Sequence, residues 1–377
     1  MRYLKIMKII ITGGGTGGHI YPGISLAKEL QKRDSRNEII FIGSDRGMES
    51  EIIPREGYQF FSLKVRGIKR KICLDNIYTI YLFLRSLIGS YKMIKKINPD
   101  FVLGTGGYVS ASVAMIASII GIPTFIHEQN AIPGITNKIL SLTSRIVFLS
   151  FPESRNYFWS KEKTVCFGNP VRESIWKGDR EEIIKKVGMD KNKKTILLFG
   201  GSKGAGVINR TFLNCMDLID KALWNKWQIL LISGKDDYSE VTKMLSNSKY
   251  SGIIYVLSYL YKIENAYGLA DLVICRAGAT TVAELTAKGL PAILIPYPYA
   301  TGDHQLYNAR YLENKQAAVV IVQKDLSEKV LAAEILNLLL KEERLKSLAQ
   351  NSKKLGNRKA AEEIINSIYQ NIKKEKS

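Results

Sequence analysis

The chain has three histidines among its 377 residues, and each lies beside residues that could take part in acid–base chemistry. His19 follows a run of glycines, His127 opens the sequence His-Glu-Gln-Asn, and His304 lies between Asp303 and Gln305. A neutral imidazole can act as a general base or bind a metal ion. Without an H-x-x-x-H spacing we expect no metal site. General-base and purely structural roles both remain open for these histidines.

Two glycine-rich loops could bind phosphate. Residues 13–18 (GGGTGG) and 200–206 (GGSKGAG) each follow an apolar strand, precede a helix, and start 187 residues apart. Glycines let backbone N–H groups approach an anion at the positive end of a helix. The first loop satisfies G-x-G-x-x-G, but the second strand ends in Gly43-Ser44 rather than in an acidic residue, so an NAD enzyme is disfavoured. A Walker A loop is excluded because His19 and Ile20 follow Gly18.

Residues 276–284 (RAGATTVAE) form a third candidate site, between a strand and a helix. Thr280 and Thr281 would lie near the N-terminal amides of that helix, where phosphate can bind. The carboxylate of Glu284 could accept hydrogen bonds from two sugar hydroxyls. The structural alternative is a capping box between Thr281 and Glu284.

Short apolar runs alternating with helical patterns predict two α/β domains, each a doubly wound parallel sheet in the Rossmann manner. We expect strands at 8–11, 38–42, 59–63, 100–103, 123–126, 145–148 and 164–167, and then at 195–199, 228–232, 253–257, 272–275 and 292–296. We expect helices at 22–32, 75–97, 108–120, 207–223, 263–269, 281–288 and within 326–374. Residues 177–194 are polar and charge-dense and interrupt the pattern. The predicted domains are residues 1–168, completed by a C-terminal helix at 358–377, and residues 169–357, facing each other across a cleft that holds the ligand.

Composition narrows the class of protein. Apolar residues make up 46% and charged residues 24%, as in ordinary globular proteins, whereas the net charge of +20 favours an anionic partner. Four cysteines lie far apart, which argues against a disulfide framework or a zinc finger. Glycines and a proline interrupt the uncharged stretch 101–126, so we expect no membrane span. No nucleic-acid-binding module is recognisable, and we expect no nucleic-acid partner.

The segment 66–96 combines positive charge with exposed-looking apolar residues. It holds eight basic residues and one acidic residue, and they flank the apolar run 77–84. A basic, aromatic-bearing helix suits an anionic membrane surface, although a core helix with a charged outer edge is the alternative. The residues that we expect to contact the membrane or a lipid acceptor are Arg66, Lys69, Arg70, Lys71, Tyr81, Phe83 and Arg85.

Taken together, the motifs resemble those of the two-domain GT-B glycosyltransferases, and specifically the family 28 N-acetylglucosaminyltransferases of peptidoglycan synthesis. The resemblance runs from about residue 8 to 357 and rests on an ordered set of motifs: 14–19 (GGTGGH), 127–130 (HEQN), 168–172 (GNPVR), 200–205 (GGSKGA), 276–284 (RAGATTVAE) and 303–309 (DHQLYNA). Each motif alone is weak, whereas the ordered set is highly specific.

The resemblance implies transfer of GlcNAc, with inversion, from UDP-GlcNAc to undecaprenyl-diphospho-N-acetylmuramoyl-pentapeptide (lipid I). It implies a peripheral enzyme on the cytoplasmic face of the cell membrane, acting in cell-wall biogenesis, cell shape and division. By carry-over, Arg172 and Leu260 would bind uracil and Glu284 the ribose. Ser202, Thr280 and Thr281 would bind the diphosphate, Asn130, Ala279 and Gln305 the GlcNAc, and Thr16, Gly17 and Gly18 would line the acceptor side.

Inverting transfer needs a base for the acceptor hydroxyl and stabilisation of the departing diphosphate. The sequence has no Asp-x-Asp, so helix N-termini and Ser202 are expected to replace a metal ion, with no cofactor. His19 is the candidate base, and the His127-Glu128 pair is the second candidate. Two related activities stay open as alternatives, a glycosyl-diacylglycerol synthase and a UDP-GlcNAc 2-epimerase.

Overall fold

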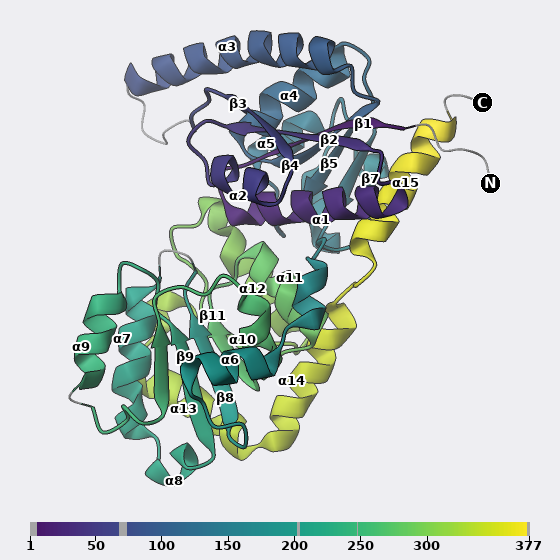
Figure 1. Cartoon of the computed structure of the whole chain (residues 1–377). Coiled ribbons are helices and arrows are strands. Elements are labelled where there is room, and N and C mark those ends of the chain that lie inside the picture. The colour runs from purple at the N-terminus through teal and green to yellow at the C-terminus, as the bar shows by residue number, and fades with distance from the viewer. Residues whose placement is uncertain (1–5, 68–73, 202–203, 247, 375–377) are drawn as a thin grey trace. The chain divides into compact units, whose positions relative to one another are not determined.

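A computed structural model describes residues 6–67, 74–201, 204–246 and 248–374. The chain divides into two compact units (Figure 1). Unit 1 comprises Met1–Arg172 together with Asn357–Ser377, and unit 2 comprises Glu173–Gly356.

Unit 1 is built on a parallel sheet whose described strands follow the order β3-β2-β1-β4-β5-β6-β7. Runs of Ile, Val and Phe form its central strands, which are buried on both faces as a parallel sheet requires. The strands are β1 (Lys8–Gly13), β2 (Glu38–Ser44), β3 (Gln59–Leu63), β4 (Phe101–Gly106), β5 (Thr124–Glu128), β6 (Ile146–Leu149) and β7 (Thr164–Cys166).

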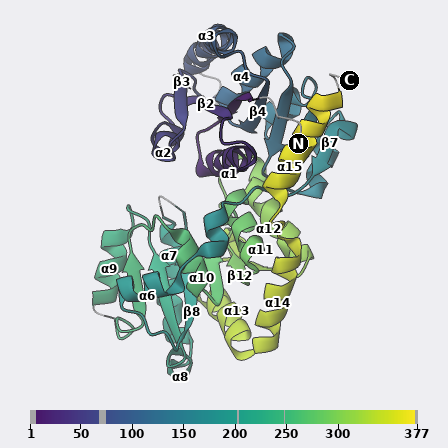
Figure 2. The ribbon, with the colours of Figure 1, turned by 45° about the vertical axis from the view of Figure 1, so that its right-hand side comes forward.

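Helices cover both faces of this sheet (Figures 1 and 2). They are α1 (Gly17–Arg33), α2 (Glu49–Arg55), α3 (Leu74–Ile97), α4 (Tyr108–Ile119), α5 (Ile135–Leu140) and α15 (Ala360–Lys374), with 3-10 turns η1 (Pro152–Tyr157) and η2 (Lys161–Lys163). Alternate residues of β1 point to opposite faces: Ile9 and Ile11 pack with α1 and α15, whereas Ile10 packs with α3 and α4. The C-terminal helix α15 therefore belongs to the core of unit 1.

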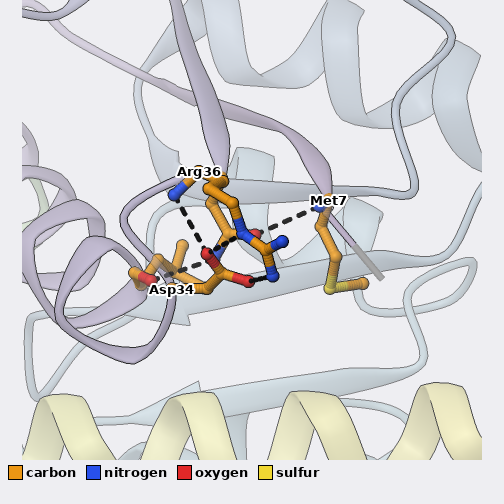
Figure 3. Close-up of polar contacts among 5 residues, drawn as sticks. Met7, Asp34 and Arg36 are labelled. Atoms are coloured by element: carbon orange, nitrogen blue, oxygen red, sulfur yellow. Dashed lines mark hydrogen bonds and ion pairs between the residues drawn. The ribbon is translucent and has the colours of Figure 1, made fainter. Parts of the chain in front are cut away.

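The turn from α1 into β2 is closed by polar contacts. The Arg36 guanidinium donates to both carboxylate oxygens of Asp34, at 2.9 and 2.7 Å (Figure 3). The hydrogen bond and the charge of Arg36 lower the pKa of Asp34 to about 2. Asn37 accepts a hydrogen bond from Met7 N at 3.1 Å and donates one to Leu30 O at 2.9 Å. These bonds connect the end of the helix to the starts of two neighbouring strands.

Unit 2 has a second parallel sheet, whose described strands follow the order β10-β9-β8-β11-β12-β13. They are β8 (Lys194–Phe199), β9 (Trp227–Ile232), β10 (Ile254–Leu257), β11 (Leu272–Cys275), β12 (Ala292–Leu294) and β13 (Val319–Val320). The α-helices are α6 (Arg180–Val187), α7 (Gly206–Cys215), α8 (Lys221–Trp224), α9 (Tyr238–Ser246), α10 (Ile263–Leu269), α11 (Ala279–Lys288), α12 (His304–Asn314), α13 (Glu328–Leu340) and α14 (Glu342–Leu355). Short 3-10 turns lie at η3 (Glu173–Lys177), η4 (Met216–Leu218), η5 (Thr301–Asp303) and η6 (Gln323–Asp325). The fold expected from the sequence, two parallel-sheet α/β domains, is confirmed.

The strand order places the motif loops at equivalent points of the two sheets. In unit 1 the order reverses between β1 and β4, and in unit 2 it reverses between β8 and β11. The loops that leave neighbouring strands at such a point diverge, which makes it the usual ligand site of a doubly wound sheet. The loops after β1 and β11 carry motifs 14–19 and 276–284, and the loop after β8 carries motif 200–205.

The structure differs from the sequence expectations mainly at short helices. Residues 177–194, expected to be irregular, contain α6, and four other short helices, α2, α5, α9 and α12, were not expected. The expected helical segment 326–374 is three helices, α13, α14 and α15. Among the described residues, no helix is both long and apolar enough to cross a bilayer.

Candidate functional site

The glycine loop after β1 is held against its neighbours by close backbone contacts. Gly14 N donates to Gly106 O at 3.2 Å, and a Cβ on Gly14 would lie 2.0 Å from the carboxylate of Glu49. Thr16 is the N-cap of α1 and makes no side-chain cap hydrogen bond. Gly17 and Gly18 form the first turn of α1, which carries no acidic residue. The positive end of this helix is therefore not neutralised within its own first turn.

Glu49, at the start of α2, is a buried carboxylate that the sequence analysis did not single out. Its oxygens accept hydrogen bonds from Gly15 N and Ser44 N, both at 2.9 Å, and from Ser44 Oγ at 2.6 Å. Only 1% of the residue is exposed. Because it satisfies an amide of the glycine loop and the Ser44 amide at the end of β2, Glu49 determines the path of the glycine loop. It also occupies the Gly15 amide, which is therefore not available to a phosphate.

His19 lies in the first turn of α1 with a defined tautomer. Its Nδ1 is 2.9 Å from the carbonyl oxygen of Thr105 and 2.9 Å from Oε1 of Gln129. A carbonyl oxygen can only accept, so the hydrogen must be on Nδ1. The other nitrogen, Nε2, then carries a lone pair and can take up a proton. The geometry gives His19 the form that a general base needs.

Gly106, at the end of β4, makes room for this imidazole. Its φ is +107°, a conformation that residues with a side chain rarely adopt. A Cβ at this position would also lie 2.7 Å from Nδ1 of His19. A glycine is thus required both by the backbone and by the approach of the ring.

His127 and Gln129 lie on one face of the chain that leaves β5. Gln129 Nε2 donates to His127 Nδ1 at 2.9 Å and to His127 O at 3.1 Å. The imidazole accepts at Nδ1, so its hydrogen is on Nε2, which donates to Gly168 O at 3.2 Å. Complete burial is the main reason why the pKa of His127 is lowered to about 4. His127 is neutral at pH 7 and contacts no solvent.

Glu128 points away from His127 and organises the loop that follows. Its Oε1 accepts from Asn130 N at 2.9 Å and Nδ2 at 3.3 Å, and its Oε2 accepts from Gly134 N at 3.1 Å and Asn137 Nδ2 at 2.8 Å. It is 1% exposed. Both oxygens are thus surrounded by donors of residues 130–137, and its carboxylate forms no pair with the His127 ring. This arrangement is that of a loop anchor.

Arg172, at the end of unit 1, lies over an aromatic ring. Its guanidinium carbon is 4.4 Å from the ring centre of Tyr21, in the second turn of α1. A Cβ on Gly17 would approach that same ring to 3.2 Å. Arg172 is therefore positioned by the helix whose first turn holds Thr16, Gly17, Gly18 and His19.

In unit 2, residues 278–284 begin α11 as the sequence analysis expected. Gly278 is the N-cap and Thr281 is already the third residue of the helix, so the alternative of a capping box between Thr281 and Glu284 is wrong. The Thr280 hydroxyl is buried and has no hydrogen-bond partner within the described part of the chain. Glu284 is 5% exposed, and its Oε2 accepts from Tyr267 OH at 3.0 Å. An amide-rich helix start and a positioned carboxylate thus lie one turn apart.

Other side chains connect the loops around α11. Arg276 Nη1 donates to Ile295 O and Pro296 O, both at 3.1 Å, and burial lowers its pKa. Asn308 Nδ2 donates to Ala277 O at 3.2 Å. Gln305 Oε1 accepts from Tyr297 N at 3.0 Å, which leaves its amide nitrogen directed elsewhere. Leu260 and Ala279 are 8% and 7% exposed, and Ser202 lies outside the described residues.

Helix α3 presents an apolar and basic stripe to solvent. One face of the helix carries four exposed apolar residues at the spacing i, i+4, i+7 and i+11. They are Ile77 (66% exposed), Tyr81 (51%), Leu84 (55%) and Ile88 (60%). Arg85 lies 5.8 Å from the ring centre of Tyr81. Arg66 and Lys95 lie 5.6 and 5.9 Å from the ring centres of Tyr78 and Tyr91. Phe83 is only half-buried rather than exposed, and Lys69, Arg70 and Lys71 lie outside the described residues.

Comparison with known proteins identifies the family of this chain. Models of the glycosyltransferase family 28 N-terminal and C-terminal domains match residues 9–149 and 195–364. A relative from Acetivibrio thermocellus, named UDP-N-acetylglucosamine–N-acetylmuramyl-(pentapeptide) pyrophosphoryl-undecaprenol N-acetylglucosamine transferase, is 44% identical over 368 residues. The match covers 97% of this chain and 99% of the relative.

Solved structures agree as well. The crystal structure of Acinetobacter baumannii MurG matches with a TM-score of 0.76 at 25% identity, covering 97% of this chain and 99% of that one. UDP-GlcNAc 2-epimerase from Neisseria meningitidis, solved with UDP-GlcNAc, matches with a TM-score of 0.70 at 14% identity, covering 97% and 100%, which concerns the fold alone. The two family models together cover most of the chain, and the resemblance inferred from the motifs is confirmed. This chain belongs to glycosyltransferase family 28.

Proposed function

We propose that this chain transfers GlcNAc from UDP-GlcNAc to undecaprenyl-diphospho-N-acetylmuramoyl-pentapeptide, with inversion at the sugar's anomeric carbon. The observation that carries the proposal is the 44% identity to a transferase of that name over 97% of the chain. The start of α11, the loop after β8 and the base-like histidine supply the chemical groups that the reaction needs. The reaction makes a glycosidic bond to a lipid-linked sugar and releases UDP.

Unit 2 binds the donor in this proposal. The amides at the start of α11, with the hydroxyls of Thr280 and Thr281, donate hydrogen bonds to the diphosphate, and Ser202 contributes from the loop after β8. Glu284 accepts from the ribose hydroxyls, helped by Tyr267, whose OH donates to its Oε2 at 3.0 Å. Leu260 contacts the uracil, and Ala279 and Gln305 the GlcNAc. Helix N-terminal amides and hydroxyls stabilise the charge that builds on the departing diphosphate.

Unit 1 supplies the base and the acceptor side. His19 Nε2 removes the proton from the acceptor hydroxyl as the new bond to the anomeric carbon forms. Thr16, Gly17 and Gly18 line the acceptor side, Asn130 contacts GlcNAc, and Arg172 contacts uracil. Glu128, whose two oxygens accept from residues 130–137, positions Asn130 and leaves the acid–base step to His19.

Helix α3 docks the enzyme on the anionic inner face of the membrane, as a peripheral protein on the cytoplasmic side. Its exposed residues Ile77, Tyr81, Leu84 and Ile88 enter the interface, and Arg66, Arg85 and Lys95 meet lipid phosphates. Such a location gives the enzyme access to an acceptor whose long polyprenyl chain stays in the bilayer.

The reaction is tested with UDP-GlcNAc and a lipid I analogue in detergent, with the product identified by mass spectrometry and the anomer by proton NMR. We expect a β-linked GlcNAc, inverted from the α-linked donor, and one UDP released per transfer. Parallel reactions with diacylglycerol as acceptor, or with no acceptor, test the two alternative activities. GlcNAc-bearing diacylglycerol, or epimerised donor without acceptor, in place of lipid II would refute the proposal.

A further inference from the structure

We propose that Gln129 is a positioning residue which, with the carbonyl of Thr105, holds His19 in the tautomer whose Nε2 is unprotonated. The inference deepens the proposed function, because it concerns the side chain assigned there as the general base. It adds that the tautomer of His19 is set by a relay of hydrogen bonds within unit 1, and that the relay runs through the amide of Gln129 to a second histidine.

The relay begins at backbone carbonyls that fix its direction. His127 Nε2 is 3.2 Å from Gly168 O, an obligatory acceptor, and 3.4 Å from Ser150 Oγ. The Ser150 hydroxyl donates to Glu128 O at 3.0 Å, so its oxygen can accept from His127. The hydrogen of the neutral His127 ring is therefore on Nε2, and Nδ1 accepts. Burial, which lowers the pKa of His127 to about 4, keeps this ring neutral.

The Gln129 amide connects His127 to His19, and the position of the His127 hydrogen determines which way the amide is oriented. Its side-chain nitrogen faces two acceptors of His127, Nδ1 at 2.9 Å and the main-chain oxygen at 3.1 Å. A carbonyl oxygen placed there would face that main-chain oxygen without a hydrogen between them, so the amide has one favourable orientation. Its Oε1 consequently faces His19 Nδ1 at 2.9 Å. Nδ1 of His19 lies between two acceptors and must carry the hydrogen.

The relay is rigid because nearly all of it is buried. His127, Gln129 and Thr105 are 0%, 1% and 1% exposed, while His19 is half-buried. In free histidine the Nε2–H tautomer is the more stable one, and it would be inactive as a base at Nε2. The protein therefore has to impose the opposite tautomer on His19. Gln129 does so without introducing a charge beside the base.

Two substitutions separate the two ends of the relay. Gln129→Met keeps the length of the side chain and removes both hydrogen-bonding groups. Gln129→Glu keeps the acceptor that faces His19, but it has no N–H for His127 Nδ1. We expect the first variant to release the His19 tautomer. We expect the second to keep it and to add a hydrogen at His127 Nδ1, because a carboxylate oxygen then faces Nδ1 while Gly168 O still accepts from Nε2.

The tautomers are read directly by ¹⁵N NMR of protein labelled at histidine, since unprotonated ring nitrogens resonate far downfield of protonated ones. The chain's three histidines give three spin systems, assigned with His19→Ala. At pH 7.5 we expect Nδ1–H for His19 and Nε2–H for His127. In Gln129→Met the His19 Nε2 signal should move upfield toward the tautomer average. The turnover number should fall about 10- to 100-fold with UDP-GlcNAc affinity retained.

The outcomes distinguish this inference from the assignment of the base. Unchanged His19 signals in Gln129→Met would overturn the inference, because Thr105 alone would then set the tautomer. So would Nε2–H for His19 in the wild type. If Gln129→Met fails to fold, a His127 ring that still lacks a hydrogen on Nδ1 in Gln129→Glu overturns the relay. If the signals behave as expected but His19→Ala keeps normal turnover, the relay stands and the base assignment fails.

Discussion

The imidazoles of His19 and His127 belong to one chain of hydrogen bonds, yet their surroundings give them different chemistry. His127 has both ring nitrogens occupied and is completely buried, so it neither gains nor loses a proton near neutral pH. His19 has Nδ1 occupied by two acceptors and presents Nε2. Two histidines whose surroundings give them different protonation chemistry are expected where one of them acts as a base.

The burial of His127 predicts acid sensitivity of the fold. Its pKa is 6.5 without the fold and about 4 within it, so between these values the unfolded state binds a proton that the folded state does not. The free energy of unfolding should therefore decrease, by about 3 kcal/mol, as pH falls from 6.5 to 4. Urea unfolding of the wild type and of His127→Gln across this range measures the effect. The variant should have a shallower pH dependence, and equal slopes would contradict the prediction.

Glu49 shows which part of a site sequence reasoning misses. An acidic residue that binds a ribose is expected at the end of the second strand, where this sequence has Gly43 and Ser44. The structure has one slightly later, on α2, and it binds the chain's own amides, Gly15 N and Ser44 N. Its contact with Ser44 spans five residues, whereas its contact with Gly15 spans 34 and is made only by the tertiary fold, so no local pattern indicates it. By contrast, the roles of residues 13–19 and 276–284 follow from a strand–loop–helix order that is visible locally.

Glu49→Ala should destabilise the protein by about 2–4 kcal/mol, because two backbone N–H groups and a hydroxyl lose their acceptor in a buried place. Urea unfolding measures the loss. Glu51→Ala is the matched control, since Glu51 lies on the same helix in an exposed ion pair with Arg55. Removing that pair should change the free energy of unfolding by less than about 1 kcal/mol. Similar losses in both variants would mean that the buried contacts of Glu49 add nothing.

At the scale of elements, strands were predictable and short helices were not. β3, β11 and α10 have the bounds expected, because runs of apolar residues are a strong signal for buried elements. Helix α6 was missed since its apolar residues, Ile183, Ile184 and Val187, are outnumbered by five charged residues in the same helix. Its ends do carry signals: the Asp179 side chain accepts from two amides of the first turn, and Gly188 ends the helix with φ of +77°. A search for caps would have found it.

The exposed basic residues of helix α3 predict that the protein binds anionic membranes through this helix. Replacing Arg85, Lys92 and Lys95 by Gln should weaken binding to vesicles with anionic lipid by about 3 kcal/mol, roughly a hundredfold. A sedimentation assay against vesicles of varied phosphatidylglycerol content measures it. The control replaces three exposed lysines of unit 2, Lys185, Lys186 and Lys191, by Gln. Equal weakening in both triple variants would show that total charge, rather than α3, determines membrane binding.

At the scale of the whole molecule, the two units share one sheet topology but use the loops at its reversal point differently. Both sheets place a glycine loop at the point where strand order reverses. In unit 1 the Gly15 amide is occupied by the Glu49 carboxylate, and the first turn of the following helix contains His19. In unit 2 the start of α11 carries Thr280 and Thr281, and the Glu284 carboxylate lies one turn further along the helix. The repeat was visible in the sequence, whereas this difference in use depends on contacts between distant segments.

The proposed function places Glu284, which binds the donor, in unit 2 and the base, His19, in unit 1. Substitutions of these two residues should therefore have different effects. Glu284→Gln, in unit 2, should weaken UDP-GlcNAc binding about a hundredfold, because charge-assisted hydrogen bonds to hydroxyls contribute roughly 1.5–3 kcal/mol. His19→Ala, in unit 1, should lower the turnover number about 10²- to 10⁴-fold and leave that affinity within about threefold of the wild type. Calorimetry with UDP-GlcNAc and steady-state kinetics measure the two effects. Loss of donor affinity in His19→Ala as large as in Glu284→Gln would place His19 in donor binding, because a base acting on the acceptor contributes to the transition state and not to the bound donor.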